Sequence, residues 1–262
     1  MKSWSLQLRE SPPGRVDASP ICLSELGESD AGGVAKTGLA CDGRRVELGE
    51  LFRVRTLDAT RPTLRIEGDA RLFDFVGQRH AYGTLQVIGS VGDHVGCSMS
   101  GGVLTVTGSV GDFLAAPRGP HRRGMTGGKI VVRGDAGGRA CHRMRRGEVI
   151  IGGNAGDALA SLMIAGTVAV TGRVGDLTGY GMSRGTIVTV KGDFASRPPS
   201  TRFGEPAILR SPFLAVLAKS MNLSAGPHRE IRELADSISS GALVRRGDFA
   251  VGGQGEWITP LA

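Results

Sequence analysis

Aromatic residues are scarce in this chain of 262 residues, at 5% of the sequence, whereas glycine is abundant, with 42 copies. Hydrophobic residues still reach 40%, so the composition indicates many tight turns around a real core. Aromatic side chains are not interleaved with the basic ones, and no known nucleic-acid-binding motif is visible. We therefore expect no nucleic-acid partner.

Long apolar runs and paired cysteines are also missing. The N-terminus lacks the apolar core of a signal peptide, and no stretch reaches the roughly 18 apolar residues of a membrane helix. We therefore expect a cytoplasmic protein that does not contact a membrane. No Cys-x-x-Cys pair and no zinc-binding histidine spacing occur, so no metal site is expected and the cysteines are expected to be buried thiols: Cys22, Cys41, Cys97 and Cys141.

What is present is a repeat. Segments that open with glycine, such as Gly83–Gly89, Gly102–Gly108 and Gly128–Gly134, align without gaps, and Gly147, Gly166 and Gly185 open three further copies. The opening glycines are 19, 26, 19, 19 and 19 residues apart. The period is therefore 19, with a seven-residue insertion in the second copy.

Each copy combines a short alternating strand with a Gly-x-x-Gly-x-x-x-small corner. We expect glycine at the first two places to supply the positive φ that a corner needs, and the small third residue to permit close packing. The glycines assigned to this structural repeat are Gly89, Gly92, Gly96, Gly108, Gly111, Gly134, Gly137, Gly153, Gly156, Gly172, Gly175 and Gly179.

A return connection this short leaves no room for a full helix between parallel strands. The repeat therefore predicts an all-β fold, a right-handed parallel β-helix of about seven coils with a period of 19 residues. Equivalent residues should stack, with Leu85, Leu104 and Ile130 beginning one inward ladder and Val87 and Val106 a second. A methionine row should line a third wall of the core: Met99, Met125, Met144, Met163 and Met182.

Two alternatives concern side chains that share the period. The methionine row could bind a soft metal, but filling of irregular core space explains it better. The aspartates Asp93, Asp112, Asp157 and Asp176 could be stacked catalytic or calcium-binding carboxylates, but Gly138 breaks the row. Turn chemistry is therefore favoured.

The flanks predict caps for the open strand edges. We divide the chain into a β-rich N-terminal cap at 1–62, the glycine-rich repeats at 63–197 and a C-terminal helical cap and tail at 198–262. Helices are predicted at 205–218 and 227–240, the second with its apolar residues on one face.

The glycine pattern, its methionine register and the C-terminal segment Arg245–Glu256 resemble the C subunit of the formylmethanofuran dehydrogenase family. The arginine-rich, lysine-poor composition favours its bacterial branch, the formyltransferase/hydrolase complex, over the archaeal molybdenum or tungsten dehydrogenase. The resemblance implies a non-catalytic scaffold that binds no cofactor itself and assembles with a hydrolase, a formyltransferase and a further subunit. It also implies a complex that moves a formyl group from formyl-tetrahydromethanopterin to a methanofuran-type carrier and hydrolyses it to formate.

Other functional classes are a stand-alone β-helical acyltransferase or polysaccharide lyase, and a spacer like the β-helix of glutamate synthase. Hexapeptide acyltransferases have a repeat of six residues, whereas the period here is 19. A lyase needs clustered carboxylates and bases that the sequence does not offer. The flanking segments fit the spacer poorly. No residue is assigned a catalytic role.

The best candidate surface is the seven-residue insertion and the copy beside it, which we call the basic corner. We expect it to dock an acidic partner surface or the polyglutamate-type tail of the carrier through guanidinium–carboxylate pairs. The alternative is a solvated arginine face. The basic corner consists of Arg118, His121, Arg122, Arg123, Arg139, His142, Arg143, Arg145 and Arg146.

Overall fold

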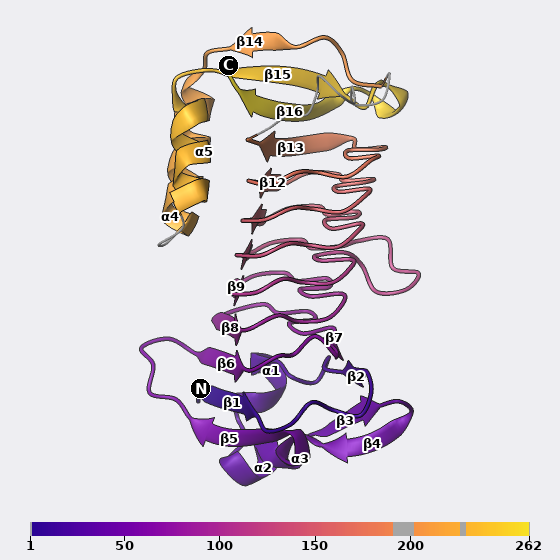
Figure 1. Cartoon of the computed structure of the whole chain (residues 1–262), viewed down its shortest axis with the longest axis vertical. Coiled ribbons are helices and arrows are strands. Elements are labelled where there is room, and N and C mark those ends of the chain that lie inside the picture. Colours follow the sequence, from indigo (N-terminus) through magenta and orange to yellow (C-terminus); the bar gives the residue numbers. More distant parts are fainter. Residues whose placement is uncertain (1, 191–201, 226–228, 262) are drawn as a thin grey trace.

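The computed structural model describes residues 2–190, 202–225 and 229–261. Figure 1 shows an elongated molecule in which short strands lie above one another along the longest axis. Seven of them follow the repeat and pair in parallel: β6 (Thr63–Glu67), β8 (Thr84–Ile88), β9 (Val103–Val106), β10 (Lys129–Val132), β11 (Glu148–Ile151), β12 (Thr167–Val170) and β13 (Arg184–Thr189).

Strands from both flanks join the same sheet. At the N-terminal end these are β1 (Trp4–Leu8) and β5 (Phe52–Thr56), and at the C-terminal end β14 (Ala207–Leu209), β15 (Ala242–Gly247) and β16 (Gln254–Pro260). The pairs β1–β5, β14–β15 and β15–β16 are antiparallel. The sheet in the described ranges therefore has twelve strands and is mixed.

The predicted fold class is wrong. The structure is a large mixed sheet with a few helices, and a right-handed parallel β-helix is not what it contains. The return connections meet their neighbours through isolated bridges, in the series Ala70, Val91, Val110, Ala136, Ala155 and Val174, and through further backbone hydrogen bonds outside named strands, such as that from the His94 nitrogen to the Asp112 carbonyl at 2.8 Å. The repeat specifies the parallel pairing of the central strands, whereas the antiparallel pairs at both ends lie outside the repeat and leave no periodic signal in the sequence.

The predicted stacking of equivalent side chains is confirmed by the strand register. Leu85 pairs with Leu104, Leu104 with Ile130, and the same ladder continues to Ile187. All members are fully buried, and so are the five methionines of the repeat. One continuous core therefore runs through the repeat, formed by side chains that lie 19 or 26 residues apart.

The corner glycines serve close packing more than unusual backbone angles. Positive φ is found at the third corner position, including Gly96 and Gly179, but among the first two positions named above only at Gly89. At Gly175 an added Cβ would lie 2.6 Å from the backbone nitrogen of Asp157 and 2.7 Å from the carbonyl carbon of Gly156. The expectation that the first two positions need positive φ is therefore wrong at most of them.

The aspartate row satisfies backbone groups, as turn chemistry predicts. The Asp74 carboxylate accepts a hydrogen bond from the backbone nitrogen of Asp93, and Asp93 accepts one from Asp112, at 2.8 and 2.9 Å. Asp112 accepts from the nitrogen of Gly138 at 2.7 Å, and the row resumes between Asp157 and Asp176. Each carboxylate thus ties one turn of the repeat to the next.

A helical layer covers part of the outer sheet face (Figure 1). α4 (Pro212–Ala225) and α5 (Arg229–Ser239) pack on outward side chains of β10 to β13, such as Val131 and Ile150. The predicted helix at 205–218 begins only at Pro212, because β14 precedes it, while the one at 227–240 matches α5 in its described part. None of the helices in the described ranges combines the length and apolar character needed to cross a membrane.

The N-terminal flank adds a second, smaller sheet and short helices. The sheet has the order β4 (Arg44–Glu47), β3 (Gly38–Cys41), β2 (Val16–Asp17) and β7 (Phe73–Asp74), and the helices are α1 (Leu23–Leu26), α2 (Ala31–Ala35) and α3 (Leu48–Leu51). At the other flank the turn between β15 and β16 holds a short 3-10 helix, η1 (Phe249–Val251). The proposed boundary between 197 and 198 lies outside the described residues.

Candidate functional site

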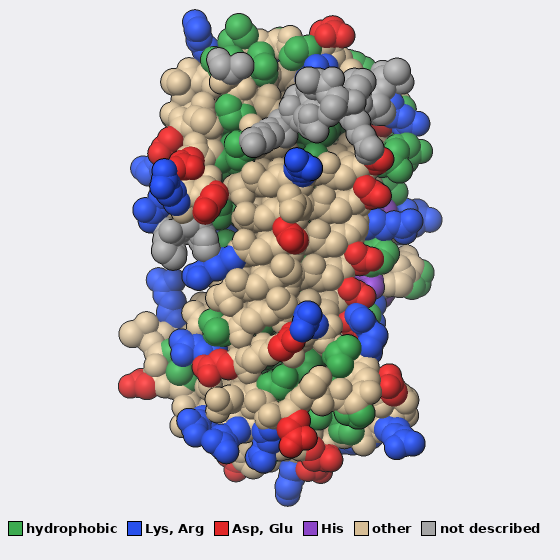
Figure 2. Space-filling view, in the orientation of Figure 1, with side chains coloured by type: hydrophobic (Ala, Val, Ile, Leu, Met, Phe, Trp, Pro, Cys, Tyr) green, Lys and Arg blue, Asp and Glu red, His purple; other side chains and the backbone are tan. Residues whose placement is uncertain are grey.

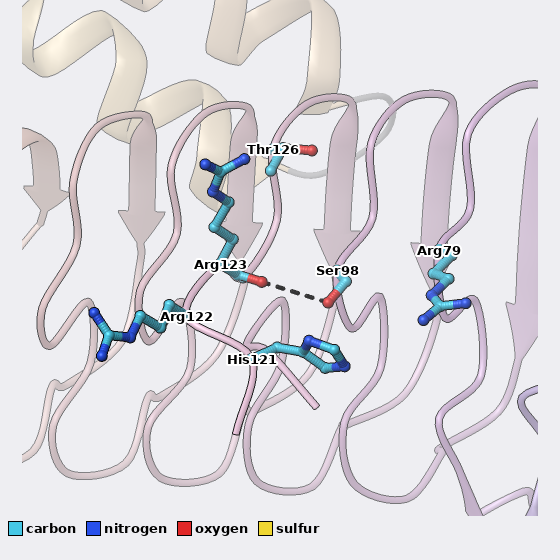
Figure 3. A pocket seen from close by; sticks show the side chains of 7 residues that line it. Arg79, Ser98, His121, Arg122, Arg123 and Thr126 are labelled. Atoms are coloured by element: carbon cyan, nitrogen blue, oxygen red, sulfur yellow. Dashed lines mark hydrogen bonds between the residues drawn. The ribbon is translucent and has the colours of Figure 1, made fainter. Parts of the chain in front are cut away.

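The seven-residue insertion forms a loop that projects from the corner side of the repeat, away from the helical layer (Figure 1). It borders a surface cavity of about 400 Å³, lined by Arg79, Ser98, His121, Arg122, Arg123, Gly124 and Thr126. Figure 3 shows Arg79 and Ser98 on neighbouring turns, with His121, Arg122 and Arg123 brought to them by the loop. The Ser98 hydroxyl donates to the Arg123 carbonyl at 3.4 Å, which fastens the loop to the turn below it.

A second cavity of about 440 Å³ also borders the loop, and His121 lines both cavities. Its lining is His94, Phe113, Pro117, Gly119, Pro120, His121, Arg139, His142 and Arg143. Neither lining contains a carboxylate among the described residues. The charged side chains in both linings are therefore arginines, which suits an anionic ligand or an acidic protein surface.

An aromatic column contributes two of its rings, His94 and Phe113, to the lining of the second cavity. The rings of Phe75 and His94 stack with centroids 4.7 Å apart, and those of His94 and Phe113 with centroids 4.8 Å apart. The Arg118 guanidinium lies 4.0 Å from the centre of the Phe75 ring, and that of Arg139 lies 5.6 Å from the centre of the Phe113 ring. Cations therefore close both ends of the column.

The two half-buried histidines of this cavity are held neutral. Burial lowers the pKa of His94 more than the nearby Asp93 and Asp74 raise it. Burial also lowers the pKa of His142, and the guanidinium groups of Arg143 and Arg139 lower it further. The His142 Nδ1 is 2.8 Å from the Ser161 hydroxyl. At neutral pH these two histidines therefore add little to the positive charge that the arginines bring to the cavity.

The structure separates the predicted residues of the basic corner into three groups. His121, Arg122, Arg123, Arg139, His142 and Arg143 line the cavities. Arg118 is held elsewhere, donating to the Asp17 carboxylate at 2.7 Å and to the Gln78 side chain at 2.9 Å. Arg145 and Arg146 are exposed and belong to neither lining.

No known family profile matches this chain. The C subunit of the Fhc formyltransferase/hydrolase complex of Methylorubrum extorquens is 35% identical over 94 residues, a match that spans 35% of this chain and 34% of that protein. The aligned segment thus covers about a third of the length of this curated relative.

The comparison that places the chain is with a solved structure, the X-ray structure of the formyltransferase/hydrolase complex FhcABCD from Methylorubrum extorquens with methylofuran. One of its chains superposes with a TM-score of 0.77 and 30% sequence identity, over 98% of this chain and 100% of that chain. The chain belongs to the C-subunit family of formyltransferase/hydrolase complexes.

Several cavity residues of this member of the C-subunit family were missed by sequence reasoning: Arg79, Ser98, Thr126, His94 and Phe113. The period could have found the aromatic column, because Phe75, His94, Phe113 and Arg139 are separated by 19, 19 and 26 residues. Stacking in one register brings such residues together. Arg79, Ser98 and Gly124 likewise share a register, being separated by 19 and 26 residues. The approach of His121, Arg122 and Arg123 to them had no such signal, since it depends on how the inserted loop folds back.

Metal-binding side chains do not gather in this member of the C-subunit family as far as the structure describes it. No group of three or more His, Cys, Asp or Glu side chains within residues 2–190, 202–225 and 229–261 is placed to hold a metal ion. His94, His121 and His142 line one cavity, but they are accompanied by arginines. The cavity residues can therefore bind and orient an anion through hydrogen bonds and charge.

Proposed function

We propose that this chain is the C subunit of a formyltransferase/hydrolase complex in one-carbon metabolism and acts there as a non-catalytic scaffold. The observation that carries the proposal is the superposition over the whole length of one chain of FhcABCD. The elongated sheet, with helices on one face and a loop on the other side, offers several separate surfaces to neighbours (Figure 1). Such a shape suits a protein that holds other subunits in place.

In this proposal the other subunits carry the chemistry. A formyltransferase and a hydrolase, with a further subunit, move the formyl group from formyl-tetrahydromethanopterin to a methanofuran-type carrier and release formate. The C subunit positions these enzymes and binds neither carrier in a catalytic site. This assignment rests on family membership.

Affinity purification from the source cell followed by native mass spectrometry tests the assembly. We expect masses that correspond to the chain with three other subunits. The isolated chain should release no formate from formylated carrier, whereas the assembled complex should. Recovery of the chain alone under gentle conditions, or turnover by the chain alone, would contradict the proposal.

We further propose that the basic corner binds an acidic partner surface or the polyglutamate-type tail of the carrier. Support comes from the two cavities beside the inserted loop, whose linings hold arginines and histidines without a carboxylate among the described residues. Planar guanidinium groups pair with carboxylates through two hydrogen bonds, which suits a chain of repeated carboxylates.

Charge reversal within the basic corner offers a matched comparison. Arg139→Glu with Arg143→Glu changes cavity residues, whereas Arg145→Glu with Arg146→Glu changes exposed arginines outside both linings. We expect the first pair to weaken binding of an oligoglutamate peptide or of the complex roughly 10- to 100-fold, and the second much less. The loss should diminish at high salt.

The measurement that changes distinguishes the carrier tail from an acidic neighbouring subunit. Loss of peptide binding with intact assembly indicates the carrier tail, and loss of assembly indicates an acidic neighbouring subunit. Equal effects of the two pairs of substitutions, or no effect of either, would mean that the basic corner is a solvated face.

A further inference from the structure

Large apolar side chains are exposed mainly at the C-terminal end of the molecule. Within the described ranges, the exposed ones outside this end are Ile88 and Val103. The others lie between residues 177 and 251: Leu177, Tyr180, Ile208, Phe213, Val216, Phe249 and Val251. A concentration of exposed apolar surface marks a contact site more often than scattered single residues do.

Four of these residues form what we call the apolar turn patch: Leu177, Tyr180, Phe249 and Val251, with exposed fractions of 60, 42, 59 and 43%. The Tyr180 backbone nitrogen donates to the Leu177 carbonyl at 3.0 Å. Arg202 connects the two halves of the patch, because its guanidinium lies 4.5 Å from the centre of the Tyr180 ring and its carbonyl accepts from the Phe249 nitrogen at 3.0 Å.

A buried carboxylate holds the patch in shape. Asp248 is fully buried, and its side chain accepts hydrogen bonds from the backbone nitrogens of Ala250 at 2.8 Å and Gly181 at 3.0 Å. It also accepts from the Arg202 guanidinium at 3.0 Å. Gly253 donates to the Asp248 carbonyl at 2.9 Å. The exposed apolar tips are thus preorganised, so ordering them costs little when a partner binds.

Two residues of the apolar turn patch, Phe249 and Val251, belong to the segment Arg245–Glu256, which lies outside the repeat and which the scaffold role leaves unexplained. The need to hold the turn through buried polar contacts explains why Asp248 and the glycines beside it are present. It does not explain why Phe249 and Val251 point outward. A binding role accounts for both observations.

The patch lies near the basic corner on the same side of the molecule. Arg139, Ala158 and Leu177 are 19 residues apart and occupy equivalent places on three successive turns. The backbone nitrogen of Arg139 donates to the Asp157 carbonyl, and that of Ala158 donates to the Asp176 carbonyl. Two turns of the repeat correspond to roughly 10 Å. In Figure 1 the turn between β15 and β16 and the inserted loop project toward the same side, and Figure 2 shows apolar side chains above basic and histidine side chains along that edge.

We propose that the apolar turn patch is the anchor at which another protein subunit docks, one that offers an apolar pocket bordered by carboxylates. The inference rests on the proposed assembly with other subunits. A second copy of this chain fits less well, because a symmetric contact would bring two basic corners toward each other. With a formal net charge of +7, the chain is matched by an acidic partner.

Reconstitution with the three other subunits tests the proposal. Phe249→Ser with Val251→Ser removes the apolar tips, and Phe213→Ser with Val216→Ser on α4 is the matched control, since these residues are also exposed by 44 and 67%. We expect the first pair to weaken assembly at least about 30-fold and the control less than about threefold. The loss should be the same at low and high salt, unlike that caused by Arg139→Glu with Arg143→Glu.

A second variant, Leu177→Glu, alters the part of the patch that lies in the repeat and leaves η1 unchanged. If folded variants, with unaltered circular dichroism and melting temperature, assemble as tightly as the wild type, the inference is wrong while the proposed function stands. If the wild type does not assemble with these subunits, both fail. If sedimentation shows a wild-type dimer that the substitutions abolish without affecting hetero-assembly, the occupant is a second copy and the inference is overturned.

Discussion

The imidazole of His94 lies flat on the ring of Phe113, with centroids 4.8 Å apart and planes 4° from parallel. The two residues are 19 positions apart and occupy equivalent places on adjacent turns. Since both line the second cavity, this contact connects the repeat of the fold to the candidate site.

Replacement of Phe113 by alanine should raise the pKa of His94. Burial is the largest cause that lowers this pKa, and removal of the ring admits water to one face of the imidazole. We expect the pKa to move toward the ordinary value near 6.5 and the free energy of unfolding to fall by about 1–3 kcal/mol. An NMR titration of the histidines measures the first change and denaturant unfolding the second. A pKa that stays or falls would show that charge, and not burial, controls His94.

Two adjacent glycines should respond in opposite directions to alanine. At Gly137 a Cβ would lie 2.2 Å from the Asp112 carboxylate oxygen and 2.8 Å from the Gly111 carbonyl carbon, whereas at Gly138 the nearest atoms are 3.6 and 3.7 Å away. We expect Gly137→Ala to destabilise the protein by about 1–3 kcal/mol. Gly138→Ala should stabilise it by about 0.4–1 kcal/mol, because alanine restricts the unfolded chain. Melting temperatures of the two variants, measured side by side, check the pair, and equal shifts would disprove the packing argument.

Asp248 should make stability depend on pH in the acidic range. Burial alone would raise its pKa, but hydrogen bonds from Ala250 and Gly181 and the Arg202 guanidinium outweigh burial and lower it. A carboxylate with a lowered pKa stabilises the fold above its unfolded pKa of about 3.9, and this contribution disappears as the pH falls through the folded pKa.

The variant Asp248→Asn isolates this contribution. At pH 7 it should unfold about 1–3 kcal/mol more easily than the wild type, and the difference should shrink below a pH of about 4. Thermal unfolding of both proteins across this range measures it. A difference that is constant with pH would mean that the carboxylate charge contributes nothing.

The register of the central strands follows from the sequence alone. Residues that recur every 19 positions, such as Leu85 and Leu104, stack because a parallel pair of equivalent segments places like beside like, and the resemblance to the C-subunit family rests on the same pattern. The role of the aspartate row in the turns was also predicted correctly, because an Asp near a corner accepts a hydrogen bond from a backbone nitrogen one turn away.

The strand pairing at the two ends of the sheet depends on the folded chain as a whole, and so does the grouping of the basic residues. β5, β14 and β15 pair antiparallel through chain reversals that leave no period in the sequence, so the fold is a mixed sheet and the predicted β-helix is wrong. Arg118 donates to the Asp17 carboxylate, 101 residues away, while His121 of the inserted loop lines a cavity with Arg79. Such pairings depend on where whole segments pack, and a local pattern carries no information about distances between segments that do not repeat.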